Sequence, residues 1–150
     1  MKIVIPTLGT RGDVQPYIAL AVGLQKAGHN VTLATHPTME SLAASYGIPF
    51  APMGPDVDIG AEAARIRNNA WNWIIGFQRV MKFTFEILEQ SHTDLLEICW
   101  SADLVVVSHS AAGKMEADKL EIPTVSVPLF PQAIPAEDPD ASSFKRAFMS

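Results

Sequence analysis

Short apolar runs alternate with helical stretches along this chain, and glycine-containing turns separate them. Lys2–Thr7 is a short β-branched run typical of a buried strand, and His29–His36 and Ile48–Met53 also predict strands. The segments between these runs have helical apolar spacing. The loops that connect these strands and helices are short. Parallel strands need a crossover between them, and a helix usually supplies it. This order therefore predicts an α/β fold, a Rossmann-like open parallel sheet with helices on both faces.

The same alternation of strand and helix recurs near the end of the chain. Asp103–His109 predicts a strand, Ala111–Leu120 a helix and Pro123–Phe130 a further strand. Residues 54–69 predict a loop, and residues 131–142 another. Between the two βα blocks we expect a long helix over 71–100, which is apolar on more than one face. One of its stripes contains Ile74, Met81, Phe85, Leu88 and Leu95. We expect this helix to pack in the core, and a binding groove is the alternative.

Size and charge restrict the function classes. The chain has 150 residues, 48% of them apolar, which is the size of one ordinary domain. Its net charge is −5 and its cations are scattered, so nucleic acid is not expected as a partner. The single cysteine, Cys99, excludes an internal disulfide. The first residues do not resemble a secretory signal, and no apolar run is long enough to cross a bilayer. We expect a soluble cytoplasmic protein, with peripheral membrane contact left open.

Several familiar site motifs are missing from the sequence. The turn after the first strand reads GTRGDVQP, which is neither the dinucleotide fingerprint nor a P-loop. The second strand ends in Thr35 and His36, where a dinucleotide-binding fold needs an acidic residue. Zinc-ligand spacings and the nucleophile elbow of α/β-hydrolases are also absent. The sequence therefore predicts no metal site and no resident cofactor.

The GTRGDVQP turn is the strongest candidate site. In an open parallel sheet, ligands bind beyond the carboxyl ends of the strands. A helix start offers backbone donors for an anion such as a diphosphate, and Gly9, Thr10, Arg11 and Gly12 are the expected cradle. Asp13 would be repelled by that anion, so it suits a neutral hydroxyl better. On spacing alone, Asp13 is either a helix cap or a catalytic base.

These motifs resemble the amino-terminal domain of the GT-B glycosyltransferases. GTRGDVQP, followed by AGHNVTLA and GIPFAPMG, is similar to the branch that contains sterol glucosyltransferases and the glycosyltransferases of glycopeptide-antibiotic synthesis. A looser similarity covers DLVVVSHSAAGKMEADKLEIPTVSVPLFP. The resemblance implies inverting transfer of a hexose from a nucleotide sugar, linked to UDP or dTDP, to an acceptor hydroxyl. Asp13 stands where wider relatives have a histidine base, so the resemblance favours Asp13 as the base.

Two later segments are candidates for the acceptor side. Ser108, His109 and Ser110 end the fourth expected strand, and Phe130, Pro131 and Gln132 begin the loop after the fifth. An alternative explanation of His109 is a strand-end histidine beside a serine that caps the next helix. The aromatic residues and the long apolar helix suggest an apolar acceptor such as a sterol, a polyketide, a lipid or another natural product, although core packing also explains them.

The length of the chain departs from the family pattern. Members of the family have a second domain that holds the nucleotide, and nothing in these 150 residues resembles it. We therefore expect residues 1–150 to be the acceptor-side domain, without the nucleotide-sugar domain and inactive by itself. The alternative is a non-catalytic Rossmann-like module that binds a ligand or a partner.

Overall fold

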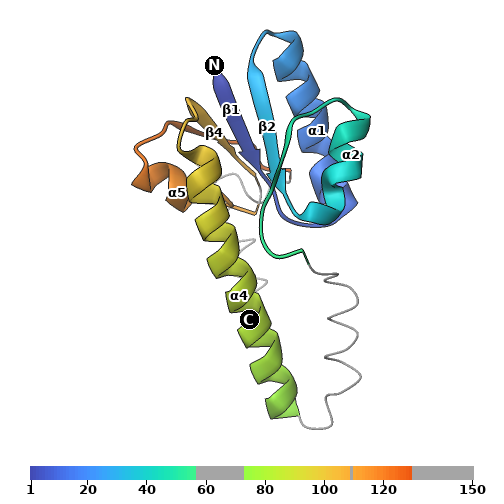
Figure 1. Cartoon of the computed structure of the whole chain (residues 1–150), viewed down its shortest axis with the longest axis vertical. Coiled ribbons are helices and arrows are strands. Elements are labelled where there is room, and N and C mark those ends of the chain that lie inside the picture. The colour runs from blue at the N-terminus through green and yellow to red at the C-terminus, as the bar shows by residue number, and fades with distance from the viewer. Residues whose placement is uncertain (57–72, 109, 130–150) are drawn as a thin grey trace, which may run out of the picture.

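A five-stranded parallel sheet forms the centre of the structure, a computed structural model that describes residues 1–56, 73–108 and 110–129. The strand order is β3-β2-β1-β4-β5, and every neighbouring pair is parallel (Figure 1). The strands are β1 (Lys2–Pro6), β2 (Asn30–Thr35), β3 (Phe50–Pro52), β4 (Leu104–Val107) and β5 (Thr124–Ser126). The expected fold class, an open parallel α/β sheet, is confirmed.

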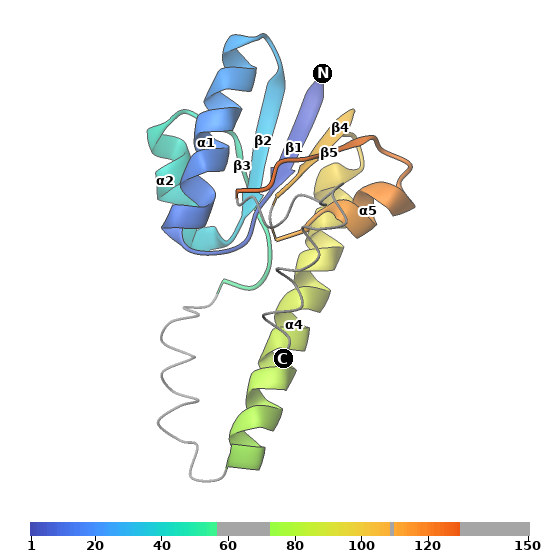
Figure 2. The same cartoon turned by 180° about the vertical axis from the view of Figure 1, so that it is seen from behind.

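Helices cover both faces of this sheet (Figures 1 and 2). They are α1 (Arg11–Lys26), α2 (Glu40–Ser45), α4 (Trp73–Cys99) and α5 (Lys114–Lys119), with a 3-10 turn, η1 (Pro37–Met39), before α2. Alternate residues of β1 divide the core, because successive strand side chains point to opposite faces. Ile3 and Ile5 pack with α1 residues such as Val14, whereas Val4 packs with Leu95 of α4. None of the described helices is long and apolar enough to span a membrane.

The strand order reverses between β1 and β4. From β1 the chain proceeds outward to β2 and β3, and it then returns to the other side of β1 to form β4 and β5. The connections from β1 and β4 therefore leave in opposite directions, and a crevice for ligands is expected at their carboxyl ends. The turn that begins at Thr7 and the turn that begins at Ser108 both start at this position.

The expectation that the long helix packs in the core is wrong for much of its described length. α4 extends past the carboxyl ends of the strands, so only its later turns lie against the sheet (Figure 2). Leu95 is 2% exposed, whereas Phe85 and Leu88, on the same stripe, are 62% and 52% exposed. The spacing identified an apolar stripe correctly, but it contains no information on how far the sheet reaches beneath the helix.

Two helix starts also differ from expectation. The sequence predicts a short helix over Thr38–Gly47 with Thr38 as its cap. The chain first makes η1 instead, in which the His36 ring accepts a hydrogen bond from the Thr38 N–H, and α2 begins at Glu40. α5 begins at Lys114 rather than Ala111, because Gly113 adopts a left-handed conformation (φ +86°) that ends the preceding turn. In both cases local turn chemistry delays the helix by a few residues.

Candidate functional site

Two residues form the centre of the turn between β1 and α1. Thr10 is the N-cap of α1, and Asp13 is the third residue of the helix. The Asp13 carboxylate accepts two hydrogen bonds on one oxygen, Oδ2: one from the Thr10 backbone N–H (2.7 Å) and one from the Thr10 hydroxyl (2.9 Å). Asp13 therefore takes part in capping α1, through the carboxylate half of a capping box rather than as the N-cap itself.

Gly9 lies directly against this carboxylate. A Cβ atom at position 9 would lie 2.5 Å from Asp13 Oδ2 and 2.8 Å from Asp13 Cβ. The backbone of Gly9 also has φ +137°, a conformation that other residues rarely adopt. A side chain at this position would displace Asp13, so glycine is required for the observed geometry of the turn.

The remaining residues of the expected anion cradle lie on the open side of the turn. Arg11 and Gly12 are exposed at the start of α1, whereas Asp13 is half-buried. The first N–H groups of a helix point outward without intrahelical acceptors, and the helix dipole is positive at this end. Arg11 adds a guanidinium with five donors. This side of the turn therefore offers positive charge and hydrogen-bond donors to an anion.

The segment after β4 closely approaches the end of β1. The Ser108 side chain is buried, and its hydroxyl is 2.7 Å from that of Ser110, which is exposed. A Cβ at Gly113 would clash with the Pro6 ring and lie 3.1 Å from Val105 Cγ1. The structure thus places Ser108 and Ser110 at the same edge of the sheet as the Thr10–Asp13 turn. His109, Phe130, Pro131 and Gln132 lie outside the described residues.

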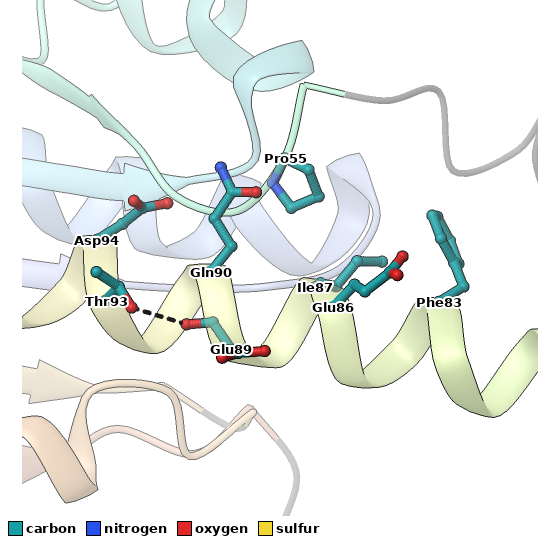
Figure 3. Close-up of a pocket in the computed structure, with 8 residues that line it drawn as sticks. All are labelled: Pro55, Phe83, Glu86, Ile87, Glu89, Gln90, Thr93 and Asp94. Carbon is teal, nitrogen blue, oxygen red and sulfur yellow. Dashed lines mark hydrogen bonds between the residues drawn. The ribbon is translucent and has the colours of Figure 1, made fainter.

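A hollow of about 510 Å³ lies between α4 and the segment after β3 (Figure 3). Pro55 faces the α4 side chains across it, among them Ile87 and Gln90. The Asp94 carboxylate accepts a hydrogen bond from the Gly54 N–H (2.8 Å) and so connects that segment to the helix. The lining combines apolar and carboxylate side chains. No pattern in the sequence predicted this hollow, because its two walls are about 30 to 40 positions apart.

A partly buried side-chain contact connects α4 to α5. His92 Nδ1 lies 2.5 Å from Glu116 Oε1, and the Glu116 side chain is only 8% exposed. Burial, with a smaller contribution from the Glu116 carboxylate, raises the pKa of Cys99 from 9.0 to about 11. Nothing in the sequence indicated that Glu116 lies near Cys99, because only the tertiary fold brings these two residues together. Within the described ranges, no cluster of three or more His, Cys, Asp or Glu side chains could hold a metal ion.

Comparisons with known proteins show which family the sequence matches. Residues 3–126 match the glycosyltransferase family 28 N-terminal domain. A sterol 3-beta-glucosyltransferase of Gibberella zeae is 39% identical over 131 residues, which cover 82% of this chain and 8% of that protein. A sterol 3-beta-glucosyltransferase of Komagataella phaffii is 38% identical over 128 residues, covering 81% of this chain and 10% of the relative.

Solved structures of glycosyltransferases share the fold. The glycosyltransferase SsfS6 of Streptomyces sp. SF2575, complexed with thymidine diphosphate, has a TM-score of 0.63 at 22% identity and covers 85% of this chain and 38% of its own. The spinosyn forosaminyltransferase SpnP has a TM-score of 0.65 at 21% identity, covering 100% of this chain and 35% of its own. The chain thus spans about a tenth of these curated relatives and little more than a third of these solved chains.

Proposed function

This chain belongs to the glycosyltransferase family 28 N-terminal domain family, and on that basis we propose that it is the acceptor-binding half of an inverting glycosyltransferase. The enzyme transfers a hexose from a UDP- or dTDP-linked sugar to a hydroxyl group of an apolar acceptor. The observation that carries this proposal is the position of Asp13. Its carboxylate is held at the start of α1, beside the point where the strand order reverses.

In the proposed reaction, Asp13 is the general base. Its carboxylate removes the proton of the acceptor hydroxyl as that oxygen attacks the anomeric carbon of the sugar. The bond between this carbon and the diphosphate oxygen breaks, and the nucleoside diphosphate leaves with the bonding electrons. Attack from the face opposite the leaving group inverts the anomeric centre. A base in this role contributes about 100- to 10,000-fold to the rate.

The start of α1 is the proposed contact for the leaving diphosphate. Arg11 is exposed there, and the backbone at Gly9 and Gly12 is open on the same side of the turn. Negative charge that develops on the leaving group would be stabilised by the guanidinium and by the helix dipole. Both sources of positive charge lie on the turn that carries Asp13, so the base and the leaving-group contact are positioned together.

The exposed part of α4 supports an apolar acceptor. Phe77, Met81, Phe85 and Leu88 are 36–62% exposed on the part of the helix that extends past the strand ends. Apolar side chains of this number on one helix are unusual at a free surface, and ligand sites are lined by such residues. We propose that a sterol, polyketide, lipid or other natural product lies along them, with Ser108 and Ser110 as polar contacts.

The nucleotide-binding half of the proposed enzyme lies in a second domain. The relatives are much longer than this chain, and its described residues contain neither a dinucleotide fingerprint nor a P-loop. In this proposal, the present chain carries the base and the acceptor surface, and the second domain makes most of the contacts to the nucleotide.

The experiment that tests the proposal is Asp13→Asn in the enzyme that contains both domains. Asparagine keeps the side-chain shape and can still accept the Thr10 hydrogen bonds, but it cannot take a proton at neutral pH. Sugar transfer is measured with a panel of UDP- and dTDP-sugars and hydroxylated apolar acceptors. We expect turnover to fall at least about 100-fold while the melting temperature changes little. Unchanged turnover would exclude Asp13 as the base, and no transfer by the unaltered enzyme across the panel would favour a non-catalytic binding module.

A further inference from the structure

The hydrogen bonds of Thr10 suggest a role different from the diphosphate contact expected for it. Both of its donors, the backbone N–H and the hydroxyl, point to the same oxygen of Asp13, at 2.7 and 2.9 Å. We propose that Thr10 is a positioning residue that orients the Asp13 carboxylate for proton removal, and that its hydroxyl is not a ligand of the diphosphate. This inference rests on the proposed function, because it assumes that Asp13 is the base.

A count of protons supports the assignment. A threonine hydroxyl has a single proton to donate, whereas an ionised carboxylate and a diphosphate can only accept. The hydroxyl of Thr10 therefore cannot serve both anions at the same time, and in the structure its proton is directed to Asp13 Oδ2. Arg11 has five N–H donors on an exposed side chain, so it can donate hydrogen bonds to a diphosphate while Thr10 continues to donate to Asp13.

The backbone makes the arrangement of these two residues rigid. The Thr10 carbonyl accepts from the N–H groups of Asp13 (3.0 Å) and Val14 (3.1 Å), so Thr10 is bound to the helix at the position of the base. Gly9 lies against the same oxygen, since a Cβ added at position 9 would lie 2.5 Å from Oδ2. Rotation of the Asp13 side chain would break both Thr10 hydrogen bonds. Bonds to a charged group are stronger than ordinary ones, so Thr10 restricts this rotation.

Orientation of a catalytic group affects the rate more than it affects binding. A misplacement of about 1 Å in a reacting group can lower the rate about 100-fold. Loss of the Thr10 hydroxyl removes one of the two Thr10 hydrogen bonds to Oδ2, so Thr10 holds the carboxylate less firmly in its orientation toward the acceptor hydroxyl. The loss should therefore appear in kcat with no change in the KM for the nucleotide sugar, whereas loss of a contact to the bound diphosphate should also raise that KM.

Thr10→Val and Thr10→Ser test this inference in the enzyme that contains both domains. Valine has nearly the shape of threonine but no hydroxyl, and serine keeps the hydroxyl. We expect Thr10→Val to lower kcat about tenfold or more with an unchanged KM for the nucleotide sugar, and Thr10→Ser to restore most of kcat. Because valine is a poor N-cap, melting temperatures are measured and activities are compared well below them. A raised KM for the nucleotide sugar with normal kcat would overturn the inference, as would normal values of both constants.

A double-mutant cycle separates the failure of this inference from the failure of the proposed function. If Thr10 acts through Asp13, Thr10→Val will cause no further loss of kcat in an Asp13→Asn background. A full additional loss in that background would show an independent role of Thr10 and overturn the inference, while the collapse caused by Asp13→Asn alone would leave the proposed function intact. Normal turnover of Asp13→Asn would instead contradict the proposed base and, with it, the role of Thr10.

Discussion

At the scale of single residues, the structure shows that two roles which the sequence offered as alternatives for Asp13 are compatible. On spacing alone, Asp13 was either a helix cap or a catalytic base. The structure makes Thr10 the N-cap and places Asp13 one turn later, from where its carboxylate reaches back to Thr10. Capping by Asp13 uses the same hydrogen bonds that hold its carboxylate at the edge of the sheet. The two roles are therefore compatible, and the cap contributes to the geometry that a base requires.

Gly9 provides a prediction at this scale. Gly9→Ala should destabilise the chain by about 1 to 3 kcal/mol, because alanine is strained at φ +137° and its Cβ would overlap Asp13. Gly23→Ala, inside α1, is the control, since outside the helix's own backbone no atom lies within 4 Å of its Cβ position. That change should stabilise by about 0.5 to 1 kcal/mol. Urea unfolding of both variants measures the difference, and equal effects would contradict the observed geometry of the turn.

Cys99 provides a second residue-scale prediction, on the dependence of stability on pH. Because the pKa of its thiol is raised from 9.0 to about 11, the folded state holds this proton more tightly than the unfolded state does. The resulting stability is complete below pH 9 and is lost as the pH rises toward 11, by about 2 kcal/mol. Unfolding free energies of the wild type and Cys99→Ala should therefore converge over this range. A constant difference between them would show that the thiol does not titrate as the burial indicates.

At the scale of elements, α4 has two different functions along one stripe. Its later turns are anchored to the rest of the fold by Leu95 in the core, by Asp94 on the Gly54 N–H and by His92 on Glu116. Its described earlier turns have exposed apolar side chains instead. The helix is therefore a support at one end and, in our proposal, a wall of the acceptor site at the other.

Leucines seven residues apart on this stripe test the division. Leu95→Ala should destabilise the chain by about 2 to 5 kcal/mol, because it removes a side chain that is 2% exposed from the core. Leu88→Ala, at a position 52% exposed, should change stability by less than about 1 kcal/mol. In the two-domain enzyme, Leu88→Ala should raise the KM for an apolar acceptor and leave the KM for the nucleotide sugar unchanged. Similar stability losses for the two variants would contradict the difference in burial.

At the scale of the whole molecule, the sheet order explains how distant segments form one site. β1 and β4 are about 100 positions apart in sequence, yet they pair directly, with Ile3 opposite Leu104. Gly113 then permits the segment after β4 to pack against Pro6 at the end of β1. Asp13, the proposed base, and Ser108 and Ser110, the proposed polar contacts of the acceptor, therefore lie at one edge of the sheet, whereas the nucleotide contacts are proposed for a second domain.

This division predicts how the chain behaves without that domain. The 150-residue chain should unfold in one cooperative transition, since its described strands form one continuous sheet. It should bind UDP- or dTDP-sugars only weakly, because the turn at α1 offers contacts to the diphosphate and few to the nucleoside. Titration calorimetry with UDP-glucose and dTDP-glucose measures this affinity. Micromolar binding by the chain alone would contradict the proposed separation of acceptor and nucleotide halves.

The sequence by itself determined the features that depend on neighbouring residues. A short β-branched run predicted β1, helical apolar spacing predicted α1, and the GTRGDVQP turn pointed to Asp13 as a candidate and to the family. These are local signals, since residues close in sequence set both the period and the turn. The assignments on His109 and on Phe130, Pro131 and Gln132 stay predictions, because those residues lie outside the described structure.

Only the tertiary structure decided which apolar surfaces are covered and which distant residues meet. A period of 3.6 residues shows that α4 has an apolar stripe, but the end of the sheet determines that Leu95 is buried and Leu88 is not. The pairing of His92 with Glu116 depends on the packing of α5 against α4, and no spacing rule relates residues 24 positions apart. Periodicity records the preference of a segment for burial, whereas the rest of the fold determines whether anything is there to bury it.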